Sequence, residues 1–178
     1  MTAQRARSHD GGLASRASAA HGPVNGRALG AVRIGIAVSR FNPSVTQALF
    51  EGAQHVLRRA GILSPQIRTL WVPGAFELPA AAAHLVASRP RPHAVIALGA
   101  LIRGRTPQYR AIAAGVAQGL CTVSAQSRVP VTFGVIVVNS PAQARARAGG
   151  RLGNRGAEAA AAALDMVRCF RATARRHR

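Results

Sequence analysis

Short apolar segments alternate with helix-forming segments along most of this 178-residue chain. Residues 33–38, 66–72, 93–100 and 131–138 form short, largely apolar runs, which is typical of buried strands. Helices are expected over residues 44–60, 78–88, 106–124, 141–148 and 154–171, where apolar residues or Ala recur at helical spacing. Because parallel strands need crossover connections, the alternation predicts a doubly wound α/β sandwich with helices on both faces of a parallel sheet.

Arginine dominates the charge of the chain. All 24 basic residues are Arg, and against 5 acidic residues they give a formal net charge of +19. The excess is spread along the chain, so the folded body should attract phosphate, RNA or acidic partners, although a compositional bias toward Arg would leave the same pattern. We divide the chain into a flexible arm (1–30), one domain (31–172) and a basic tail (173–178).

Several classes of protein are disfavoured. No segment approaches the roughly 20 apolar residues of a membrane-spanning helix, so we expect no membrane association and a cytoplasmic location. Cys121 and Cys169 are too few for a disulfide framework and are expected to be buried thiols. The six histidines lack metal-ligand spacing, which predicts no metal site, and Walker A, GxGxxG, HExxH and GxSxG motifs are missing.

The segments that follow the expected strands indicate where a ligand binds, because ligands of such sheets sit outside the carboxyl ends of the strands. Phe41 follows the first strand, Glu77 follows the second, and Gly104 and Thr106 follow the third. Gly and Thr before a helix suit a phosphate group, because free N–H groups and the helix dipole face it, but they are also ordinary capping residues. Glu77 could equally favour a helix dipole, and Phe41 could belong to the core.

Five segments along the chain form a recognisable set. They are residues 39–42 (SRFN), 72–79 (VPGAFELP), 98–104 (LGALIRG), 130–135 (PVTFGV) and 147–156 (RAGGRLGNRG). Together, and in this order along about residues 31–170, they resemble the lumazine synthase family. The resemblance implies a flavodoxin-like fold with a four-stranded parallel sheet.

This resemblance implies a reaction and a set of site residues. The reaction is the condensation of 5-amino-6-(D-ribitylamino)uracil with 3,4-dihydroxy-2-butanone 4-phosphate, which releases phosphate and needs no cofactor or metal. By resemblance, the substrate-binding residues are Phe41, Ala75, Phe76, Glu77, Leu101, Ile102, Phe133 and Arg155, and the phosphate-binding residues are Gly104, Arg105, Thr106 and Arg147. Phe133, Arg147 and Arg155 would come from a neighbouring subunit.

One departure from the family pattern concerns catalysis. Gln108 stands where the family has the histidine proposed to transfer protons. Glutamine can orient a substrate, but it has no pKa near neutrality, and general acid–base catalysis typically contributes about 10² to 10⁴ in rate. Arg105 and Arg110 also replace residues that are commonly acidic in the family. We therefore expect an attenuated synthase, because proximity and phosphate binding can still accelerate the reaction.

Assembly offers an alternative function. The resemblance implies a homo-oligomer, either a pentamer or a 60-subunit capsid, whose sites are shared between subunits. A paralogue that had lost the chemistry could act as a positively charged shell for non-specific RNA or other anionic cargo. A sequence-specific nucleic-acid protein is disfavoured, because aromatic residues are only 4% of the chain and no recognition motif is present.

Overall fold

The sheet of the protein is parallel and four-stranded. The computed structural model describes residues 32–176, so the expected arm over residues 1–30 lies outside the described residues. The strand order is β2-β1-β3-β4, and all neighbouring pairs run parallel. This arrangement confirms the predicted fold class. The strands are β1 (Ile34–Ser39), β2 (Ile67–Val72), β3 (Ala94–Ile102) and β4 (Val131–Val138).

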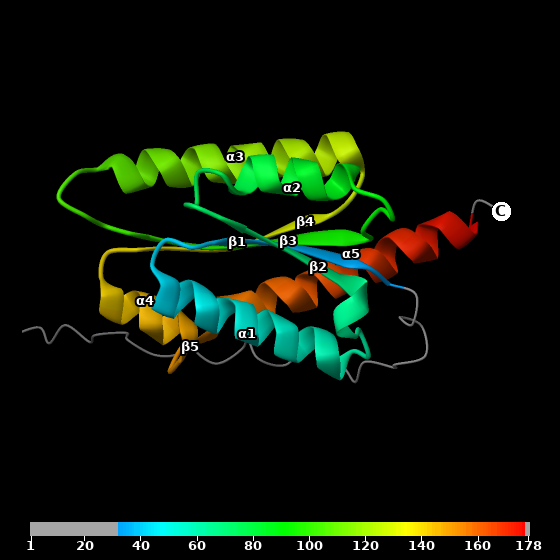
Figure 1. Cartoon of the computed structure of the whole chain (residues 1–178), viewed down its shortest axis with the longest axis horizontal. Coiled ribbons are helices and arrows are strands. Elements are labelled where there is room, and N and C mark those ends of the chain that lie inside the picture. Colours follow the sequence, from blue (N-terminus) through cyan, green and yellow to red (C-terminus); the bar gives the residue numbers. More distant parts are fainter. Residues whose placement is uncertain (1–31, 177–178) are drawn as a thin grey trace, which may run out of the picture.

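Helices cover both faces of the sheet. Figure 1 shows α2 and α3 above the sheet and α1, α4 and α5 below it. A short 3₁₀ turn, η2 (Ser64–Gln66), precedes β2. The helices are α1 (Pro43–Arg59), α2 (Leu78–Ala87), α3 (Gln108–Ser127), α4 (Pro141–Arg147) and α5 (Arg155–Arg176).

Residues on the two faces of the strands belong to different buried apolar clusters. Ile34, Ile36 and Val38 of β1 point toward α1 and α5, where they join one buried apolar cluster. Ala37 of β1 and Val95 of β3 belong to a second cluster that includes residues of α2 and α3. Because β1 and β3 are buried on both faces, they read as nearly continuous apolar runs in the sequence.

Helices α1 and α3 begin at residues that differ from the prediction. The third long helix begins at Gln108 rather than Thr106, with Pro107 at its N-cap. Proline disfavours helical geometry in the residue before it, which keeps Thr106 in the preceding loop. The first helix begins at Pro43 rather than Ser44, and its N-cap Asn42 has left-handed backbone angles.

Two features near the end of the chain differ from expectation. A small antiparallel pair, β5 (Ala148–Gly150) and β6 (Gly153–Asn154), precedes α5 and was not predicted. Helix α5 continues to Arg176, so residues 173–176, assigned to the basic tail, are helical. The described helices contain none that is long and apolar enough to cross a membrane.

The cysteines correct a prediction. Cys121 on α3 and Cys169 on α5 are both exposed free thiols rather than buried ones. Cys121 comes one residue after the buried Leu120, and Cys169 comes two residues after the buried Val167. Because successive residues of a helix are rotated by about 100°, both cysteine side chains point away from the core. The mainly apolar sequence around each cysteine therefore does not predict whether the side chain points into the core or toward the surface.

Candidate active site

The carboxyl ends of β1 and β3 meet at the point where the strand order reverses. The chain leaves β1 toward β2 on one side, whereas β3 pairs with β1 on the other side. Asn42 bridges the two exits, because its side-chain Nδ2 donates a hydrogen bond of 3.0 Å to the Ala100 carbonyl oxygen. Ser39 Oγ accepts a 3.2 Å hydrogen bond from the Phe41 N–H. This crevice is where doubly wound sheets bind ligands.

A cavity of about 280 Å³ opens at this crevice. The ring of Phe41 is 67% exposed at its rim, which shows that this residue is not part of the core. Six of the residues predicted from the sequence line this one cavity, together with Asn42, Ala100, Tyr109 and Ile112. The six are Phe41, Leu101, Ile102, Gly104, Thr106 and Gln108.

Positive charge is concentrated in the loop between β3 and α3 and in the first turn of α3. Arg103, Arg105 and Arg110 line an adjoining cavity of about 170 Å³, together with Gly104 and Thr106. A Cβ atom added at Gly104 would meet nothing within 4 Å, so packing within this chain does not demand glycine there. The open space above the Gly104 backbone leaves room for an anion to approach its N–H group.

Tyr109 occupies the centre of the site. Its side chain is only 9% exposed and borders both cavities described above. Its hydroxyl donates a hydrogen bond of 3.1 Å to Asn139 Oδ1 and accepts one of 3.1 Å from Arg110 Nε. The Arg110 guanidinium lies 5.7 Å from the Tyr109 ring centroid, within the range of a cation–π contact.

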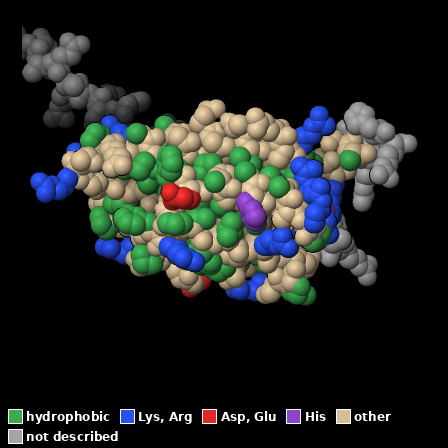
Figure 2. Space-filling view, turned by 45° about the horizontal axis from the view of Figure 1, so that its top comes forward, with side chains coloured by type: hydrophobic (Ala, Val, Ile, Leu, Met, Phe, Trp, Pro, Cys, Tyr) green, Lys and Arg blue, Asp and Glu red, His purple; other side chains and the backbone are tan. Residues whose placement is uncertain are grey.

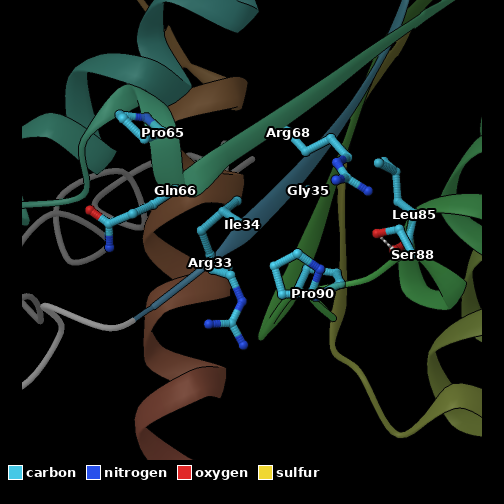
Figure 3. Close-up of a pocket in the computed structure, with 10 residues that line it drawn as sticks. Arg33, Ile34, Gly35, Pro65, Gln66, Arg68, Leu85, Ser88 and Pro90 are labelled. Carbon is cyan, nitrogen blue, oxygen red and sulfur yellow. Dashed lines mark hydrogen bonds between the residues drawn. The ribbon is translucent and has the colours of Figure 1, made fainter.

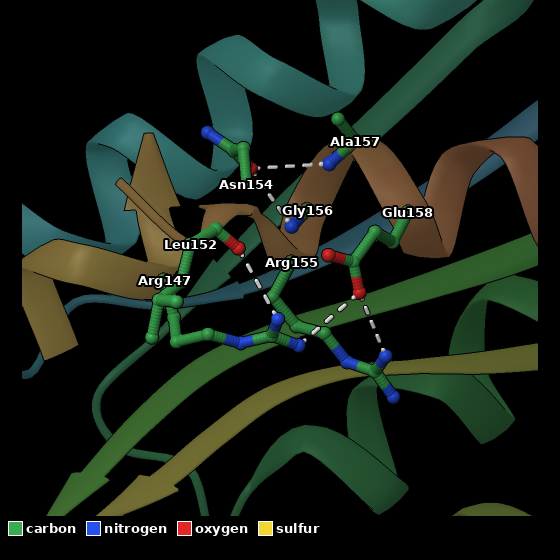
Figure 4. Close-up of polar contacts among 7 residues, drawn as sticks. All are labelled: Arg147, Leu152, Asn154, Arg155, Gly156, Ala157 and Glu158. Atoms are coloured by element: carbon green, nitrogen blue, oxygen red, sulfur yellow. Dashed lines mark hydrogen bonds and ion pairs between the residues drawn. The ribbon is translucent and has the colours of Figure 1, made fainter. Parts of the chain in front are cut away.

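Arg147 and Arg155 converge on one carboxylate, as Figure 4 shows. Glu158 Oε2 accepts hydrogen bonds from Arg147 at 3.2 Å and from Arg155 at 3.0 Å. Arg147 also donates to the Leu152 carbonyl oxygen at 3.2 Å. Together with Tyr109, Arg147 lines a third cavity of about 500 Å³, whereas Arg155 lines none of these cavities. Exposed ion pairs of this kind contribute little stability, so a phosphate group could compete for Arg147.

Asn154 holds the start of α5 in place. Its Oδ1 accepts hydrogen bonds from the N–H groups of Gly156 at 2.9 Å and Ala157 at 3.1 Å, which caps α5. Its Nδ2 donates to the Ala48 carbonyl oxygen of α1 at 2.8 Å. The start of α5 is therefore tied to α1, and the position of Glu158 follows from that tie.

Other predicted site residues lie apart from the crevice cavity. Ala75, Phe76 and Glu77 follow β2, and Phe76 is 67% exposed. Glu77 Oε2 accepts a 2.8 Å hydrogen bond from the Gly74 N–H, which holds the turn. Phe133 lies within β4 and packs against the α2–α3 core. None of these four residues lines the cavity at Phe41.

Asn42 and Asn139 were not among the predicted site residues. The Asn42-Pro43 pair signals a turn, but no sequence pattern reports that the Asn42 amide reaches Ala100, 58 residues away. Asn139 follows β4, so its position after a strand is a signal that could have drawn attention to it. The described residues contain no group of His, Cys, Asp or Glu suited to hold a metal ion.

This geometry defines a doubly wound α/β protein with an arginine-lined cavity and an exposed aromatic ring at its topological switch point. Comparison with known proteins identifies the family. The sequence model of 6,7-dimethyl-8-ribityllumazine synthase matches residues 31–171. The chain is 47% identical over 144 residues to the 6,7-dimethyl-8-ribityllumazine synthases of two strains of Thermus thermophilus, covering 81% of this chain and 91% of each relative. The chain therefore belongs to the lumazine synthase family and is a transferase of that family.

Proposed function

We propose that the protein condenses 5-amino-6-(D-ribitylamino)uracil with 3,4-dihydroxy-2-butanone 4-phosphate and releases phosphate. The observation that carries this proposal is the crevice cavity of about 280 Å³, which brings the exposed Phe41 ring and the Gly104–Thr106 loop to one place. An aromatic face suits a pyrimidine ring, and the loop suits a phosphate group. Membership of the family supports both substrate assignments.

The phosphate group would lie over the loop between β3 and α3. Gly104 and Thr106 offer backbone and hydroxyl donors, and Arg105 adds a guanidinium beside them. Arg147 of a neighbouring subunit would supply a further cation once phosphate displaces Glu158 from it. Arginine forks bind phosphate oxygens in a bidentate manner, which fixes the orientation of the substrate as well as its position.

The pyrimidine and its ribityl chain would extend from Phe41 along the sheet edge. Phe41 would stack on the ring, with Leu101 and Ile102 forming the floor of the cavity. Ala75, Phe76 and Glu77 would hold the ribityl chain. Because these three residues and Phe133 lie outside the crevice cavity, we infer that the complete site forms between subunits of a homo-oligomer. Phe133, Arg147 and Arg155 would then face the crevice of a neighbouring subunit.

Catalysis would be attenuated because nothing at the position of Gln108 titrates near neutral pH. The Gln108 side chain is exposed, lines the cavity and makes no hydrogen bond to another residue of the described chain. The neighbouring Tyr109 hydroxyl is already engaged by Asn139 and Arg110. The site would therefore work by holding both substrates together rather than by moving protons.

The experiment measures lumazine formation against the protein-free background. We expect the purified protein to exceed that background and Phe41→Ala to raise KM for the uracil substrate about tenfold, since stacking on a base is worth about 1–3 kcal/mol. Phe170→Ala is the matched control, because Phe170 is also an exposed phenylalanine but lies on α5. A wild-type rate equal to background would overturn the proposal.

The alternative function, a positively charged pentameric or capsid shell for RNA or other anionic cargo, is favoured by one observation. Many of the described arginines have no carboxylate partner. Among the described residues, Glu158 pairs with Arg147 and Arg155, and Asp165 pairs with Arg168. Asp165 and Arg171 have further contacts besides these. An anionic cargo would offset this charge. Salt-dependent co-purification of nucleic acid would support the shell, and preparations free of nucleic acid at low salt would count against it.

A further inference from the structure

The amino-terminal edge of the sheet carries a second small cavity, at the opposite end of the strands from the candidate active site. The cavity has a volume of about 90 Å³ and lies where β1 and β2 begin. Figure 3 shows Arg68 of β2 reaching across β1 toward Leu85 and Ser88, with Arg33 on the other side beside Pro90. Two guanidinium groups therefore flank one hollow that is walled by prolines.

Backbone carbonyl groups hold these arginines in place. Arg33 Nε donates to the Arg91 carbonyl oxygen at 3.2 Å, and Arg68 Nη2 donates to the Arg89 carbonyl oxygen at 3.4 Å. Arg91 in turn donates to the carbonyl oxygen of Ser127. A guanidinium has five N–H donors, so each of these contacts leaves most of the donors available to a ligand.

No carboxylate of the described chain neutralises this edge. Arg33, Arg68, Arg89 and Arg91 form no ion pair within residues 32–176. In Figure 2 the blue Arg side chains gather at the right-hand end, which is the end where β1 begins in Figure 1. Arg58 and Arg59 in the last turn of α1 and Arg128 at the C-cap of α3 complement helix dipoles. Arg33 directly precedes β1 and Arg68 lies on β2, so neither has such a role.

His93 lies close to the arginine charges of this edge. Its Nδ1 accepts a 3.0 Å hydrogen bond from the Arg33 N–H. Burial lowers the pKa of His93, and the charges of Arg171 and Arg33 lower that pKa further. Burial is the largest cause of this lowered pKa, and the arginine charges add to it, so a bound anion would offset only the contribution of those charges.

We propose that the amino-terminal edge binds a phosphate group between the guanidinium groups of Arg33 and Arg68. A phosphate dianion offsets two positive charges at once, and its oxygens match the fork geometry of arginine. The cavity of about 90 Å³ has room for a single small anion rather than for a whole nucleotide. The phosphate can be free inorganic phosphate or one phosphodiester of an RNA strand that continues over the neighbouring arginines.

Chemical footprinting tests this site without depending on enzymatic activity. The full-length protein is treated with phenylglyoxal, which modifies accessible guanidinium groups, and modification of each arginine is quantified by peptide mass spectrometry. The two probes are inorganic phosphate and a 15-nucleotide oligo(U), each titrated in a phosphate-free buffer. Arg145 is the internal control, because it is exposed on α4 at the opposite edge and has no side-chain partner within the described residues.

We expect saturating probe to slow modification of Arg33 and Arg68 about tenfold relative to Arg145. Protection by inorganic phosphate identifies free phosphate as a sufficient ligand, and protection by oligo(U) alone identifies the phosphodiester of an RNA strand. Equal modification of Arg33, Arg68 and Arg145 with both probes would overturn the proposal.

A variant separates one shared site from two independent arginines. Arg33→Gln should abolish the protection of Arg68, because one phosphate bridges both groups, whereas Arg145→Gln should leave that protection unchanged. Undiminished protection of Arg68 in Arg33→Gln would contradict a shared site. Lumazine formation by Arg33→Gln should equal that of the wild type, since the cavity lies away from the crevice residues.

Discussion

Arginine plays different roles at the two ends of the same sheet. At the carboxyl edge, Arg147 and Arg155 share the carboxylate of Glu158. At the amino edge, Arg33 and Arg68 donate only to backbone carbonyl oxygens among the contacts of the described chain. An anion at the carboxyl edge must compete with a resident carboxylate, whereas an anion at the amino edge would meet uncompensated charge. The comparison shows that net charge alone does not locate a binding site, because the partners of each charge decide what a ligand gains.

Two glycines near opposite edges of the sheet are required for different reasons. A Cβ atom added to Gly156, at the start of α5, would overlap the backbone carbonyl of Leu49. Gly61, which ends the turn after α1 near the amino edge, has a positive φ of 79° but open space around it. Close packing therefore demands glycine at the start of α5, while backbone conformation alone demands glycine at the turn after α1.

The largest expected effect tests this difference in packing. Gly156→Ala should lower the free energy of unfolding by about 3 kcal/mol, because helix α5 must move away from α1 to relieve the overlap. Gly61→Ala should cost only about 1 kcal/mol, the penalty of a left-handed alanine. Urea unfolding of both variants measures the two losses. Equal losses would show that the start of α5 is no more constrained by packing than the turn at Gly61.

The second prediction concerns two neighbouring charges of the carboxyl edge, Arg147 and Arg145, during turnover. Arg147→Gln should raise KM for the phosphate-bearing substrate about ten- to hundredfold, because one charge-assisted hydrogen bond contributes about 1.5–3 kcal/mol. Arg145→Gln, which removes the same charge two residues earlier, should leave KM unchanged in steady-state assays. A similar rise in both variants would mean that long-range attraction, rather than a contact at Arg147, binds the phosphate.

The third prediction concerns the hydrogen bond from Asn42 to the Ala100 carbonyl oxygen, which joins the ends of β1 and β3. Asn42→Ala should lower the free energy of unfolding by about 1–2 kcal/mol, because it removes the hydrogen bond to Ala100 and places alanine at a φ of 60°. Asn42→Gly removes the same bond but tolerates that φ, so it should cost less. Urea unfolding distinguishes the two, and a greater loss for glycine would contradict this account of Asn42.

The smallest expected effect is a pH dependence at the amino edge. The pKa of His93 lies below its ordinary value of 6.5 in the folded state, so the unfolded chain binds a proton more readily. The stability contributed by neutral His93 is complete above pH 6.5 and decreases as the pH falls from 6.5 toward the folded-state pKa. Unfolding of wild type and His93→Gln at several pH values should show a shallower decline for the variant. Parallel curves would assign the decline to other groups.

The sequence was most informative where one local pattern decides the structure. The apolar run over 131–138 coincides with β4, Val131–Val138, because its apolar and β-branched residues favour a strand. This holds although β4 is an edge strand in which only Gly134, Val135 and Ile136 are buried. Helix starts were less predictable, since Pro107 and Asn42 impose local geometry that apolar spacing does not report. The β5–β6 pair is too short to leave a periodic signal.

The candidate site was predictable only in part, for a similar reason. Position after a strand placed Phe41, Gly104 and Thr106 near one another, and they line one cavity. The pairing of Arg147 with Glu158 and the contact of Tyr109 with Asn139 join segments by side-chain reach, which no spacing rule reports. The amino-edge arginines were visible only as net charge, because Arg33 and Arg68 come together only when β1 pairs with β2.

The pH dependence of the rate tests the central claim most directly, namely that the carboxyl edge binds both substrates but lacks a proton-transfer group at Gln108. Lumazine formation is measured for wild type and Gln108→His between about pH 6 and 8, where an imidazole titrates. We predict that the variant is faster by about tenfold or more and that its kcat acquires a transition near the imidazole pKa, while the wild-type kcat shows no such transition. A wild-type rate that already equals the variant's, with the same pH profile, would contradict the claim.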